Sequence, residues 1–173
     1  MERELGGKLT VLQRQKVDFN NGEVVVLGCT LHSYIPEDYT ELTNDFAKIE
    51  GWRVAHHNDE HAADLEWLEQ SLAEVHTMSP QSRVIIATHY APSFENTVPP
   101  EREHNAVGHC FSSNILKKFR WWRGADMVSH WIFGHTHYNN RFAFNDVTVV
   151  SNTPSGLIPE RSPGLPFDPK LVI

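Results

Sequence analysis

The sequence predicts an α/β domain, because short apolar segments typical of buried strands alternate with helical patterns along its 173 residues. Two of these segments, RVIIAT (83–88) and HWIF (130–133), are continuously apolar, as strands covered on both faces are. The residues between them include a stretch with helical spacing. A hydrophobic content of 40% suits one globular core, so we expect a single domain over residues 1–173.

The chain opens with a predicted β-hairpin. Strands are expected near residues 16–19 and 23–28, on either side of Asn20-Asn21-Gly22. Asn and Gly tolerate positive φ and are typical of tight hairpin turns. Residues 34–51 show no sustained period and predict a long excursion with one helical turn over 43–49. Loops of this length often carry function.

Helices and strands then alternate. Asn58 or Asp59 is expected to cap a helix that runs to about His76. Its apolar residues recur at helical spacing: Leu65, Leu68, Leu72 and Val75. A buried strand is predicted over 83–88, and prolines make residues 91–110 a loop.

The last third of the chain contains a second helix, expected over residues 112–121, and another buried strand over 130–133. RFAF and VTVV, joined at Asn145-Asp146, predict a terminal hairpin. The tail from Pro154 is rich in Pro and Gly and is expected to wrap the surface.

Charge and cysteine content exclude several classes of protein. The net charge of −7 argues against a nucleic-acid partner, and the basic residues Lys117, Lys118, Arg120 and Arg123 fit the solvated face of one helix. Cys29 and Cys110 are far apart, which argues against a disulfide framework or a zinc knot. No apolar stretch approaches the roughly 18 residues that span a bilayer. We therefore expect a cytoplasmic protein whose partners are small molecules or proteins.

Three histidines follow the ends of buried strands. His89 comes directly after RVIIAT, while His135 and His137 follow HWIF and Gly134. Residues i and i+2 of an extended segment face the same way, so His135 and His137 are expected to point to one place that His89 also reaches. Imidazole suits Zn, Mn, Fe, Co or Ni. These three histidines are the predicted metal ligands.

Other histidines have competing interpretations. His57 to His61 match the pattern H-x-x-E-H of some zinc proteases, but a cap at Asn58 or Asp59 would leave His57 outside the helix, so we favour capping. His104 and His109 lie in the 91–110 loop and belong either to a polar loop or to a lid that contacts substrate. The remaining ones are expected to be structural: His32, His56, His76 and His130.

THYAP (88–92), GHTH (134–137) and SNTPSG (151–156) resemble the calcineurin-like metallophosphoesterases, and GCTLHS (28–33) extends the resemblance over nearly the whole chain. The resemblance implies a four-layer α/β/β/α sandwich and hydrolysis of phosphomonoesters or phosphodiesters at a dinuclear centre of Mn, Fe, Zn or Co. It also implies that His89 and His135 bind one ion and His137 the other.

The sequence departs from this family at its beginning. No predicted strand ends in Asp-x-His, and the chain contains no Gly-Asp or Gly-Asn dipeptide, so the family's bridging carboxylate and the Asn ligand have no counterpart. We therefore expect an incomplete domain, the C-terminal part of the sandwich. It should bind at most one ion and be inactive alone. It should also leave the edges of RVIIAT or its neighbours unpaired and an apolar sheet face uncovered, which self-association or a partner completes. Two alternatives are a non-catalytic binding or assembly module and a mononuclear metal site with other chemistry.

Overall fold

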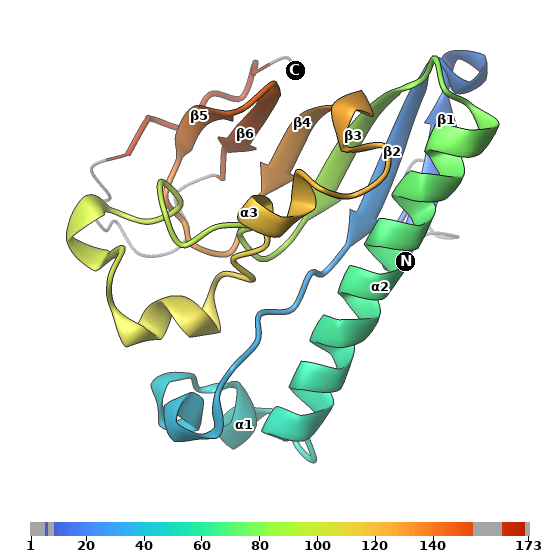
Figure 1. Cartoon of the computed structure of the whole chain (residues 1–173). Coiled ribbons are helices and arrows are strands. Elements are labelled where there is room, and N and C mark those ends of the chain that lie inside the picture. The colour runs from blue at the N-terminus through green and yellow to red at the C-terminus, as the bar shows by residue number, and fades with distance from the viewer. Residues whose placement is uncertain (1–5, 7–8, 154–163, 172–173) are drawn as a thin grey trace.

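The computed structural model describes residue 6, residues 9–153 and residues 164–171, which are organised around one mixed six-stranded sheet (Figure 1). The strand order is β1-β2-β3-β4-β6-β5. The four central strands are parallel, and β1 and β5 are antiparallel edges. The strands are β1 (Gln15–Phe19), β2 (Val24–Cys29), β3 (Arg83–Thr88), β4 (Val128–Phe133), β5 (Asn140–Phe144) and β6 (Val147–Ser151). The predicted α/β class is confirmed.

Both predicted hairpins are present. Asn20, Asn21 and Gly22 join β1 to β2 with φ values of 51°, 56° and 90°. This left-handed backbone is the conformation for which Asn and Gly are suited. Asn145, with φ of 52°, turns the chain between β5 and β6.

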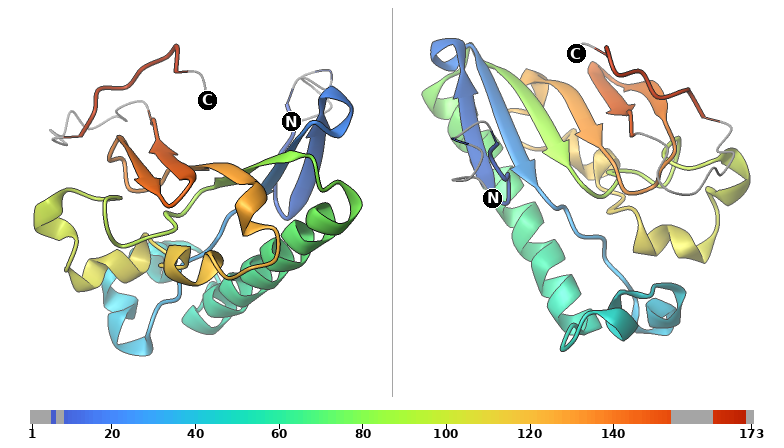
Figure 2. Two further views of the ribbon diagram at one scale, coloured as in Figure 1. Left: turned by 45° about the horizontal axis from the view of Figure 1, so that its top comes forward. Right: turned by 180° about the vertical axis from the view of Figure 1, so that it is seen from behind.

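The helices lie on one side of the sheet (Figure 2, left). Helix α2 (Val54–Met78) runs along the sheet, and the short helices α1 (Asp45–Lys48) and α3 (Leu116–Phe119) lie in the connections. Short 3-10 turns cover Glu37–Leu42, Pro100–Arg102, Ala106–Cys110 and Ala125–Met127. The core forms where Leu68 and Leu72 of α2 and Phe119 of α3 meet Leu27 and Trp131 of the sheet. No helix among the described residues is both long and apolar enough to cross a membrane.

Helix α2 begins earlier than its sequence predicts. It starts at Val54, and neither Asn58 nor Asp59 caps it. The amide of Asn58 instead donates to the Ile35 carbonyl and accepts from the Ile35 amide, both at 2.9 Å. Asn58 is therefore used to anchor the 34–51 excursion, a long-range contact that local capping rules cannot anticipate.

Helix α3 is shorter than the predicted 112–121. Ser112 forms a β-bridge with Ala91, and the Ser113 amide donates to the Ala91 carbonyl at 2.8 Å. Asn114 has a φ of 51°, which interrupts helical geometry. The proline-containing loop after β3 thus holds Ser112 and Ser113 in a non-helical pairing with Ala91, and the helix begins only after Asn114. The tail predicted from Pro154 lies mostly outside the described residues.

The prediction of an unpaired edge at RVIIAT or its neighbours is wrong. Strand β3 pairs with β2 on one side and β4 on the other, so the sheet ends at β1 and β5. The sheet face opposite α2 nevertheless carries apolar side chains, because the strand alternation places Val26, Ala87 and Ile132 there, all half-buried, beside His130 and Thr148. Near this face, the side chain of Leu12 lies against Gly28 and leaves no space for a Cβ atom.

We predict that the chain associates through this apolar face at micromolar concentration, because contiguous apolar surface of several hundred Å² promotes association. Sedimentation velocity measures this. An Ile132→Lys variant should shift the population toward monomer, whereas Lys170→Glu at an exposed position should not. A compact wild-type monomer with a sharp thermal transition would contradict the prediction.

Candidate functional site

The candidate site lies where three parallel strands end side by side. The carboxyl ends of β2, β3 and β4 share one edge of the sheet, and hydrogen bonds tie the segments that leave them together. The amides of His89 and Tyr90 donate to the Thr30 carbonyl, and the Gly134 amide donates to the His89 carbonyl at 3.1 Å. Binding sites of parallel α/β sheets commonly form at this edge.

His89 and His135 meet at this edge, with ring centroids 4.6 Å apart. Aromatic rings enclose His135 on its other sides, because the rings of Tyr90 and Phe111 lie 4.4 Å and 4.8 Å from it. The sequence therefore predicted correctly that these two histidines come together. The three-ligand metal site itself stays a prediction.

Both rings favour the neutral form. Burial, with a smaller effect of nearby His89, lowers the pKa of His135 to about 4. Although His89 is exposed as a residue, its ring is crowded by protein, and this partial burial lowers its pKa, as do His32 and His137. A neutral imidazole has the free nitrogen lone pair that metal binding needs.

His137 is placed differently from the expectation. His135 and His137 have φ values of 64° and 54°, so the segment is not extended and the i, i+2 argument does not hold. His137 is exposed, but it lies close enough to help lower the pKa values of both His89 and His135. Left-handed backbone at two non-glycine residues costs energy, and such strain is frequent at functional sites.

The two histidines of the 91–110 loop have different environments. His104 is exposed. His109 is half-buried, with its ring 5.2 Å from that of Tyr39 and 4.9 Å from that of Phe94. The ring contacts give His109 a fixed position beside a pocket that also includes residues of α2 and α3, whereas no ring contact of His104 occurs among the described residues.

The structure adds a polar cluster that the sequence analysis missed. His32, Glu60 and Asp64 place one ligand atom each within 4.8 Å of one another, and this is the only such group of three or more among the described residues. It could hold a metal ion. His32 had been expected to be structural, yet it follows strand β2 as His89 follows β3, so the signal was present in GCTLHS (28–33).

Protein groups already satisfy the carboxylates of this cluster. Asp64 is fully buried and accepts from the His32 amide at 3.1 Å, and its second oxygen accepts from Gln13 at 3.2 Å. Arg14 lies 3.3 Å from Asp64 and 2.6 Å from Glu60. An ion at this cluster would therefore have to compete with a guanidinium that already neutralises both carboxylates.

The H-x-x-E-H pattern lies wholly within α2, because the helix starts before His57. His57 and His61 are thus one turn apart, contrary to the capping argument. Their rings bind elsewhere: His57 Nε2 lies 3.5 Å from Ser33 Oγ, and His61 Nδ1 donates to the His32 carbonyl. Glu60 is bound to Arg14, so the three side chains of the pattern hold α2 against the residues that precede β1 and follow β2.

One further carboxylate lies near the histidines. The charge of Asp45 in α1 acts to raise the pKa values of both His57 and His135, against the larger effect of burial. The 34–51 excursion therefore brings an acidic side chain back toward the carboxyl edge of the sheet.

No model of a known protein family matches the chain, and no curated protein matches it significantly by sequence. Among solved structures it is similar to a phosphopantetheinyl hydrolase from Mycobacterium tuberculosis, with a TM-score of 0.44, 12% identity, and coverage of 74% of this chain and 48% of that chain. It is also similar to a putative 5'-nucleotidase from Staphylococcus aureus in complex with alpha-ketoglutarate, with a TM-score of 0.39, 15% identity, and coverage of 80% and 23%. The chain thus spans about half of the first protein and about a quarter of the second. Likenesses at this level carry no functional conclusion.

We predict that acid destabilises the protein through His57, which is 1% exposed and whose pKa is lowered to about 4 by burial and by His32. The unfolded chain binds the proton more readily, so the free energy of unfolding should fall by about 3 kcal/mol as the pH drops from 7 to 4. Urea denaturation with chelator present measures this. His57→Gln should flatten the slope, while exposed His56→Gln should leave it unchanged. Equal slopes in all three proteins would contradict the assignment.

Proposed function

We propose that the chain is a metallophosphoesterase-type domain in which His89, His135 and His137 hold one divalent ion that binds phosphoester substrates. The observation that supports this most directly is the contact between the neutral rings of His89 and His135 where β3 and β4 end. The resemblance of THYAP and GHTH to calcineurin-like metallophosphoesterases points to the same residues.

The donor set fits the proposed ion. Neutral imidazoles bind Mn, Fe, Zn and Co without having to lose a proton first. A bound divalent ion supplies electrophilic stabilisation of phosphoryl oxygens and a more acidic water. The protein's own contribution is to hold His135 between His89, Tyr90 and Phe111, so that its ring is oriented in advance.

A second candidate is the non-catalytic binding module. The observation that favours it is Arg14, which engages both Glu60 and Asp64 and so keeps these carboxylates from a metal. The two candidates differ in a measurable way, because only the first requires an ion at His89 and His135.

We predict that the chain binds at most one divalent ion, weakly, because His89 and His135 are neutral and Arg14 already engages Glu60 and Asp64. Calorimetric titration with Zn²⁺ or Mn²⁺, with metal analysis after dialysis, measures this. His135→Ala should abolish binding, and Glu60→Gln should not.

The Glu60→Gln variant distinguishes the proposed site at His89 and His135 from the cluster of His32, Glu60 and Asp64. Loss of binding in Glu60→Gln but not in His135→Ala would place the ion at His32, Glu60 and Asp64 and overturn the assignment. Two tightly held equivalents would show that another carboxylate takes part, and Asp45→Asn would then test the one whose charge acts on His135.

We also predict that the chain alone hydrolyses generic phosphomonoesters and phosphodiesters at a rate within about tenfold of that of His135→Ala, a difference of about 1.4 kcal/mol in barrier. Two-metal hydrolysis needs a carboxylate between the ions, and Arg14 engages those of Glu60 and Asp64. Release of 4-nitrophenol from 4-nitrophenyl phosphate measures the rate. Substantial turnover that His135→Ala abolishes would refute this prediction.

A further inference from the structure

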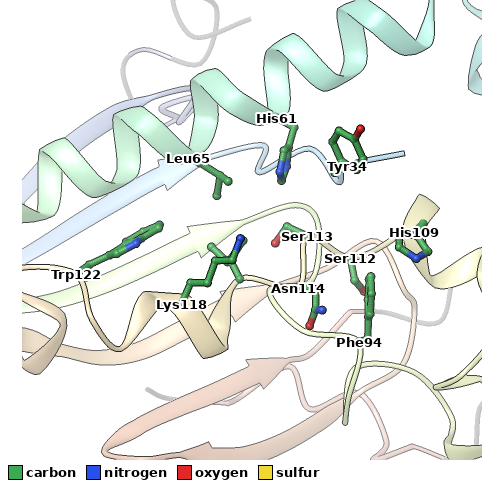
Figure 3. Close-up of a pocket in the computed structure, with 11 residues that line it drawn as sticks. Tyr34, His61, Leu65, Phe94, His109, Ser112, Ser113, Asn114, Lys118 and Trp122 are labelled. Atoms are coloured by element: carbon green, nitrogen blue, oxygen red, sulfur yellow. The ribbon is translucent and has the colours of Figure 1, made fainter. Parts of the chain in front are cut away.

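A cavity of about 430 Å³ opens between α2 and α3, beside the loop that follows β3 (Figure 3). Pockets for small molecules commonly begin at about 300 Å³, so the cavity is large enough for a molecule with one ring and a charged group. The residues that line it are separate from His89, His135 and His137.

The cavity has an apolar wall with a fixed aromatic ring. Leu65 of α2 lines it, as do Ile115 and Trp122, which lie on either side of α3. The ring of Trp122 packs edge-on against that of Phe119 in the core, with centroids 5.7 Å apart. A rigid indole beside aliphatic side chains is a surface on which a flat ligand ring packs well.

The charged lining of the cavity is basic. Lys118 lines it together with His61 and His109, and no Asp or Glu is among the lining residues. Figure 3 shows the Lys118 side chain directed into the space between α2 and the residues before α3. No carboxylate in the described part of the chain pairs with Lys118. Its neighbour Lys117 differs, because it points away to a 2.7 Å ion pair with Glu95.

Further polar groups surround the lysine. Among the described residues, the side chains of Ser112 and Asn114 have no hydrogen-bond partner, although both line the cavity. His61 donates from Nδ1 to the His32 carbonyl, which leaves Nε2 as an acceptor. The cavity therefore combines one unpaired cation with uncommitted donors and an apolar wall.

We infer that this cavity is a binding site for a small organic anion that carries a flat ring, with the anion on Lys118 and the ring against Trp122. The site is independent of the proposed metal, since it uses none of its ligands. Lys118 has no carboxylate partner among the described residues, and its direction toward a space with an apolar wall leaves its ammonium group available to such an anion.

The test uses phenylphosphonate, a ring-bearing anion that cannot be hydrolysed as a phosphate ester, with the ¹⁵N-labelled chain in EDTA. The Trp122→Phe variant identifies the indole signal of Trp122. We expect this signal to move saturably with phenylphosphonate. Inorganic phosphate and benzyl alcohol, which each carry half of the recognised chemistry, should bind at least about tenfold more weakly, which is 1.4 kcal/mol or more.

Two adjacent lysines supply the matched variants. Lys118→Ala should weaken phenylphosphonate binding at least about tenfold, whereas Lys117→Ala should stay within about twofold. Both side chains are exposed, so neither variant should unfold the protein, and dispersed amide spectra check this. Equal effects of the two variants, or shifts that spare Trp122, would overturn the inference. A requirement for Zn²⁺ in place of EDTA would also overturn it, by placing the anion at the metal.

Discussion

Asp64 is a buried carboxylate, and the arrangement of the site depends on its neutralisation. A buried charge without a partner costs several kcal/mol, so residues from distant parts of the chain must converge on it. They are Arg14 and Gln13 from the segment before β1 and His32 from the segment after β2. Gln13 also accepts from the amide and hydroxyl of Thr30, which holds this segment against the end of β2.

This polar anchor determines how α2 lies on the sheet. The buried face of the helix changes character along its length, from His57 and Asp64 near its start to Leu68, Leu72 and Val75 near its end. The apolar half supplies burial against the sheet, while the polar half holds the residues that leave β2. Helix α2 is thus both a wall of the core and the support of the carboxyl edge where His89 and His135 meet.

The same edge connects the two candidate binding regions. Phe111 lies against His135, and the next residue, Ser112, lines the cavity beside α3. His61 binds the His32 carbonyl from the cavity side, while the His32 ring contacts Tyr90. A ligand in the cavity would therefore contact Ser112, the neighbour in sequence of the Phe111 ring that packs against His135. The two proposed sites use different side chains but depend on the same backbone segments.

The sequence by itself determined the α/β class, the strands, both hairpins and the convergence of His89 and His135. These depend on short-range patterns, and parallel strands bring their carboxyl ends to one edge whatever the details of packing. Only the tertiary structure decided the start of α2, the length of α3 and the direction of His137. Asn58 does not cap α2 because it hydrogen-bonds Ile35. Helix α3 is short because Ser112 bridges to the loop after β3, and His137 points away from the expected direction because the GHTH segment has left-handed backbone. The cluster of Arg14, His32, Glu60 and Asp64 escaped prediction for the same reason: its members are far apart in the chain, and the electrostatic cost of burying Asp64 is a property of the folded protein alone.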